Sequence, residues 1–154
     1  MVKGQTYNFV LNSAVAGNAN TRNCRFDINW PTDMPLQKAY KMRFSFCSAI
    51  GVFTNVDIAN IFMDVGGGNT TVFASSEFAG QTAYKGGFIG LLQWFGTVNG
   101  KLYAATTDNP PVYFAQRPTQ DFVKIEIHSN AATQMTEYSV APPQWTMVLS
   151  FEEQ

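Results

Sequence analysis

Hydrophobic and polar residues alternate with a period of two along most of this chain. In the run that begins at Cys24, for example, Cys24, Phe26 and Ile28 alternate with polar residues. Successive side chains of a β-strand point to opposite faces of its sheet, so each such run buries one face and exposes the other. We therefore expect strands in the runs at residues 7–12, 24–30, 41–46, 59–65, 123–128 and 145–152.

Glycine, proline and asparagine separate these runs. Asn99-Gly100 is a two-residue hairpin signal, because both residue types tolerate a positive φ. The segment 86–95 combines glycines with aromatic residues, which favours a strand that is buried on both faces or lies at a close sheet contact. No window keeps a helical period over three turns. The chain is predicted to be a single all-β domain over residues 1–154, a sandwich of two antiparallel sheets with roughly eight to ten strands.

The composition adds a clue about the surface. Only 14% of the residues are charged while 45% are hydrophobic, whereas a typical globular domain has about 25% charged residues. A surface of neutral polar residues costs little to desolvate, which suits a protein packed in an assembly; an ordinary neutral soluble domain is an equally good interpretation. The net charge of −1 and the scattered basic residues argue against a basic groove for nucleic acid.

The ends and the hydrophobic stretches give two further expectations. Residues 1–5 hold no apolar core of a signal peptide, so secretion through a signal peptide is not expected. No stretch approaches 18 apolar residues, so we expect no membrane-spanning helix.

Few residues are candidates for chemistry. His128 is the only histidine, on the polar face of its predicted strand, and Cys24 and Cys47 lie on predicted apolar faces. Two buried cysteines in a reducing compartment are the favoured interpretation. A Cys–His nucleophile would need one of them to meet His128, and nothing in the sequence indicates that. One histidine with two apolar cysteines does not supply a zinc site.

Other motifs also have structural explanations. Gly66-Gly67-Gly68 is followed by a predicted strand instead of the helix that a phosphate-binding loop needs. Asp57 and Asp64 are predicted on opposite faces of one strand, and Glu152 and Glu153 lie just before the last residue. No carboxylate pair has a defined catalytic spacing, and the sequon Asn69-Thr70-Thr71 is interpreted as incidental. We predict no catalytic, cofactor or metal site, and no enzymatic activity, with calcium held by loop oxygens left open.

A resemblance appears when several segments are taken together in order: residues 26–30 and 41–48, then 88–92, 102–104, 108–112 and 117–118, and last 122–125 and 145–152. This pattern resembles the single jelly-roll penton and minor capsid proteins of virophages, polinton-like viruses and related eukaryotic double-stranded DNA viruses. The chain departs from a full penton base because it is too short for an inserted second jelly roll.

The resemblance implies a single jelly-roll fold and a structural role in an icosahedral capsid. As a penton at a five-fold vertex, the chain would form a homopentamer that contacts the major capsid protein, and it would be found in virions assembled inside the host cell. The loops at residues 13–21, 31–38 and 106–111 are the expected contact regions. A minor capsid or cement protein at another capsid position is the alternative within this family.

Two functions from other classes also fit the sequence. A carbohydrate-binding attachment domain would use stacking aromatics, with Tyr103 beside Asp108 and Asn109, or Tyr113, as candidates; we favour a core or interface role for these aromatics. A cytokine-like trimer would fit Gly90-Leu91-Leu92 and the aromatic strands loosely, and the expected lack of a signal peptide argues against it.

Overall fold

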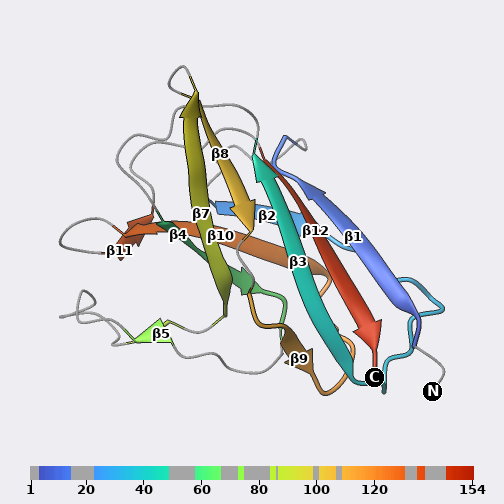
Figure 1. Ribbon diagram of the computed structural model, residues 1–154. Helices are drawn as coiled ribbons and strands as arrows, with labels where there is room; N and C mark the ends of the chain where they lie inside the picture. Colours follow the sequence, from blue (N-terminus) through green and yellow to red (C-terminus); the bar gives the residue numbers. More distant parts are fainter. Residues whose placement is uncertain are drawn as a thin grey trace.

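A computed structural model of the protein describes residues 4–14, 23–48, 58–66, 73–74, 84–85, 87–98, 101–106, 109–130, 135–137 and 145–154. These residues form strands, turns and extended segments, with no helix among them. Two main antiparallel sheets pack against each other (Figure 1). The prediction of an all-β sandwich is therefore confirmed.

The first sheet has four strands in the order β1-β12-β3-β9, all antiparallel. Their bounds are Thr6–Asn12 for β1, Trp145–Glu153 for β12, Tyr40–Ser48 for β3 and Val112–Phe114 for β9. The last strand of the chain thus lies between the first and the third, which brings the two ends of the chain into one sheet.

The second sheet has six strands. Five follow the order β11-β10-β4-β7-β8, and β2 also pairs with β10. Their bounds are Asn23–Asp27 for β2, Ile58–Asp64 for β4, Phe88–Val98 for β7, Lys101–Thr106 for β8, Phe122–Asn130 for β10 and Met135–Glu137 for β11. A separate pair joins β5 (Phe73–Ala74) to β6 (Tyr84–Lys85). The two main sheets together hold ten of the described strands, within the predicted range.

The core lies between the two sheets and follows the predicted alternation. In β12 every second residue is buried, and Trp145, Met147, Leu149 and Phe151 are at most 1% exposed. The ring of Phe151 contacts rings from several elements, namely Phe9, Trp30, Tyr40 and Phe114. Trp145 packs against Phe26 of the opposite sheet. The central strand β12 therefore carries the side chains that join the layers.

The strand predicted within residues 86–95 is confirmed from Phe88 onward, where β7 begins, and β7 lies between β4 and β8. Val98 pairs with Lys101, as a two-residue hairpin at Asn99-Gly100 requires; those two residues lie outside the described part.

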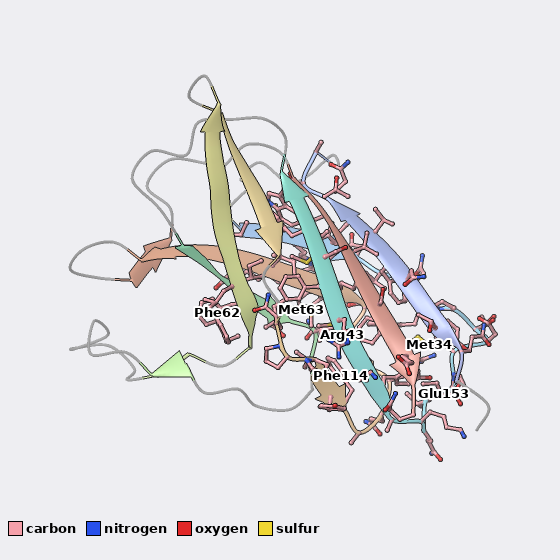
Figure 2. The ribbon with its side chains drawn as sticks, in the orientation of Figure 1. Met34, Arg43, Phe62, Met63, Phe114 and Glu153 are labelled. Carbon is pink, nitrogen blue, oxygen red and sulfur yellow. The ribbon has the colours of Figure 1, made fainter. Side chains whose placement is uncertain are left out.

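Two details differ from the periodic pattern. Strand β2 ends at Asp27, three residues before the end of the predicted run. The alternation of burial continues beyond it, with Ile28 buried and Trp30 half-buried. Beyond Asp27 the backbone pairing continues only at Ile28, whose N–H donates to the Asp121 carbonyl. In β4, Phe62 is buried together with its neighbours Ile61 and Met63. Phe62 lies on the other face of the strand from Met63 (Figure 2), outside the main core cluster, and packs against Phe88.

Candidate functional site

The described residues contain no group of three or more histidine, cysteine, aspartate or glutamate side chains placed to hold a metal ion. Cys24 is fully buried and not disulfide-bonded, and burial raises the pKa of its thiol to about 11. The reactive thiolate is therefore scarce near neutral pH. The side chains of Cys47 and His128, and all of Asp57 and residues 67–71, lie outside the described part. No helix in the described ranges is long and apolar enough to cross a membrane.

The glycan-binding candidates are only partly brought together. The Asn109 side chain accepts a hydrogen bond from the Leu91 backbone N–H at 2.9 Å and donates one to the Leu91 carbonyl at 3.0 Å. Its amide is thus occupied in fixing the segment before β9 to β7. Tyr113 is 51% exposed on β9. Asp108 and the Tyr103 side chain lie outside the described part.

Of the three predicted contact loops, only residues 31–38 are described throughout; the structure describes residues 13–14 of the first loop and residues 106 and 109–111 of the third. Loop 31–38 is held to the sandwich through four consecutive backbone carbonyls. The hydroxyl of Tyr7 donates to the Asp33 carbonyl at 2.9 Å, and that of Tyr40 donates to the Pro35 carbonyl at 2.6 Å.

Arg117 binds the two remaining carbonyls of this series. Its Nη1 donates to the Met34 carbonyl at 3.0 Å and its backbone N–H donates to the Leu36 carbonyl at the same distance. The Nε atom of Arg117 is buried without a hydrogen-bond partner, a cost that the loop attachment must offset. Met34 itself is 1% exposed and its N–H donates to the Pro31 carbonyl. The loop is therefore fixed in shape by both its backbone and one buried side chain.

Burial and the Glu153 carboxylate both favour the protonated, donating form of the two tyrosines. Burial raises the pKa of both Tyr7 and Tyr40, and the Glu153 carboxylate raises both further. Glu153 also lies 3.6 Å from Lys38 Nζ. The loop nevertheless presents exposed Leu36, at 42%, toward solvent. This end of the sandwich thus combines a rigid backbone with an exposed apolar side chain (Figure 2 labels Met34 and Glu153 here).

A groove of about 460 Å³ runs between β1 and the segment that includes the end of β2. Its lining comprises Asn8, Phe9, Val10 and Leu11 on one side and residues 25–29 on the other. Val10 is the most exposed large hydrophobic residue described, at 67%. Arg25 and Asp27 at the groove form an ion pair with 3.6 Å between Nε and Oδ1, so the charges of the groove cancel.

Sequence reasoning selected loop 31–38 but missed how it is fixed and missed the β1 edge altogether. The attachment depends on Tyr7, Tyr40 and Arg117, which are far apart in the chain, so no local signal predicts it. The β1 edge does have a sequence signal, because the segment from Thr6 to Asn12 contains neither a charged residue nor a proline.

No protein-family model matches the chain, and no curated protein is significantly similar to it.

Proposed function

We propose that this chain is a single jelly roll that serves as a structural capsid protein, most specifically the penton at the five-fold vertices of an icosahedral double-stranded DNA virus. In this role it assembles as a homopentamer within the virion and contacts the major capsid protein. The proposal combines the sequence resemblance described above with the strand order of the two sheets.

The strand order is the observation that carries the proposal. A jelly roll winds eight strands into two sheets, and the fold recurs in viral capsid proteins. With β5, β6, β8 and β11 set aside, eight strands remain. The first, eighth, third and sixth of these form one sheet, and the second, seventh, fourth and fifth form the other. This is the winding expected when a long hairpin is rolled up, with the first and last strands as neighbours.

The fixed loop 31–38 supports a contact role in such a shell. A ring of subunits requires two different surface patches that meet between neighbours. A loop that is already ordered loses little conformational entropy on binding, which favours association. The small number of charged residues fits a surface that is largely covered by neighbours.

Native mass spectrometry of the purified full chain tests this proposal. We expect a pentamer, or a rise to pentamer as the protein concentration is increased. A chain that stays monomeric at high concentration, or that forms a stable trimer, would contradict the penton role. A trimer would favour the minor capsid or cement position instead.

A carbohydrate-binding attachment domain remains the second candidate because Tyr113 is half exposed. The commitment of the Asn109 amide to Leu91 weakens it, since that amide is one of the polar groups the site would need. A glycan array settles the matter: specific binding that disappears in a Tyr113→Ala variant would support this function, and no binding would remove it.

A further inference from the structure

The free edge of β1 lacks the features that normally protect a sheet edge. Strand β1 is the end strand of its sheet, and in the described part of the chain no strand pairs with its outer side. All seven of its residues pair with β12 without a register shift. Exposed, regular edge strands recruit other strands, and proteins usually prevent this with charges, prolines, bulges or short length. Strand β1 has none of these.

The other edges with described side chains are protected. Strand β9, at the opposite edge of the same sheet, is only three residues long and follows Pro110 and Pro111. Strand β2 carries two exposed charged residues, Arg25 and Asp27. Among the edges with described side chains, β1 is therefore the one without such protection.

The backbone pattern of β1 identifies which groups face outward. Ser13 N–H donates to the Trp145 carbonyl, and Glu153 N–H donates to the Gln5 carbonyl. Hydrogen-bonded pairs alternate along an antiparallel ladder, so Tyr7, Phe9 and Leu11 bond toward β12. The N–H and carbonyl groups of Asn8 and Val10 must then point to the free edge. They form a row of donors and acceptors suited to an added strand.

We propose that this edge pairs with β1 of a second copy of the same chain, in antiparallel orientation. No charge repulsion opposes this pairing, because the strand is uncharged along its whole length. In the register centred on Phe9, Asn8 lies opposite Val10 of the second copy, and both expose their backbone groups toward each other. The two four-stranded sheets then join into one continuous sheet.

The neighbouring groove leaves room for this approach. It lies beside β1 and is lined by Phe9 and Leu11 as well as by residues 25–29. Pairing at this edge uses the backbone of β1, whereas the proposed ring contacts of the penton use loop 31–38. The inference therefore does not depend on the proposed function.

Sedimentation velocity at increasing concentration of the full chain provides the test, with Val10→Pro as the blocking variant. Proline has no N–H to donate, and at Val10 that group points away from β12, so the fold should be kept. Val10→Thr is the matched control, because it is β-branched and retains the N–H. Asn8→Pro blocks the same edge at a second position, and the melting temperature of each variant reports folding.

We expect the wild-type chain and Val10→Thr to pair through this edge, as two single chains or as two pentamers, while Val10→Pro and Asn8→Pro lower the association constant of this pairing by at least about tenfold. The inference is overturned if the folded proline variants associate as the wild type does. It is also overturned if the wild type never pairs, or if this edge binds only a different shell protein. If the wild type and Val10→Pro are both single pentamers with no further association, the penton proposal stands and edge pairing is refuted. Pairs without any five-fold species would support edge pairing and contradict the penton proposal.

Discussion

Replacing Trp145 with alanine should destabilise the protein more than almost any other single change. Its side chain is 1% exposed and lies between the sheets. It stacks on Phe46 of its own sheet, with ring centroids 5.3 Å apart and an interplanar angle of 28°. It also meets Phe26 of the opposite sheet edge-on, with centroids 5.8 Å apart. Its removal therefore leaves a cavity where the two layers join.

The expected magnitude follows from these contacts. A buried tryptophan replaced by alanine costs about 3–5 kcal/mol in transfer and cavity terms, and two aromatic pairs place Trp145 in the upper part of that range. For a domain of this size, each kcal/mol lowers the melting temperature by about 2–4 °C. We expect a total drop in the melting temperature of about 8–20 °C.

Reversible urea denaturation followed by circular dichroism, together with a thermal scan, measures the effect. Leu36→Ala is the matched control, because Leu36 is 42% exposed and should change stability by no more than about 0.5 kcal/mol. A loss below about 1 kcal/mol for Trp145→Ala would refute the core role. It would mean that this face of β12 belongs to an interface between chains instead.

Other changes test local contacts. A Cβ added at Gly90 would lie 2.6 Å from Asn109 Cγ, so Gly90→Ala should displace the Asn109 amide and cost about 1–3 kcal/mol. Asn109→Ala should cost a similar amount, and the double variant little more; fully additive losses in a double-mutant cycle would contradict the coupling. In a Cys47→Ser background, Cys24 should react with a thiol reagent at pH 8 far more slowly in the folded than in the urea-unfolded chain, and equal rates would refute its burial. Because folding raises the Cys24 pKa from 9.0 to about 11, the thiol loses its proton at a lower pH in the unfolded chain than in the folded one. Stability should fall as the pH rises through this interval, and less so in Cys24→Ala.

The periodic pattern predicted the layers well, because the buried face of a strand consists of every second residue, and those residues are hydrophobic. The alternation from Trp145 to Phe151 is the clearest example, and both ends of this run are core residues. Phe62 departs from the pattern, since its burial on the outer face depends on Phe88 across the sheet. Periodicity within one strand carries no information about such a neighbour.

The candidate contact surfaces were harder to predict, because they too depend on residues that are distant in the sequence. Proline and polar residues marked loop 31–38 as a turn region, but its rigidity comes from Tyr7 and Arg117, whose positions in sequence are remote. The order of strands in each sheet is likewise a tertiary property. The sequence shows that the β1 segment lacks charged residues, but it does not show that β1 is an edge strand. That follows only from the strand order, in which β1 is the end strand of its sheet.

The native mass of the Val10→Pro variant is the most direct test of the proposed role in a capsid vertex. This variant removes edge pairing, so any remaining association must use the ends and sides of the sandwich. A mass of five chains is the result predicted for a penton. A mass of one chain at high protein concentration would contradict it.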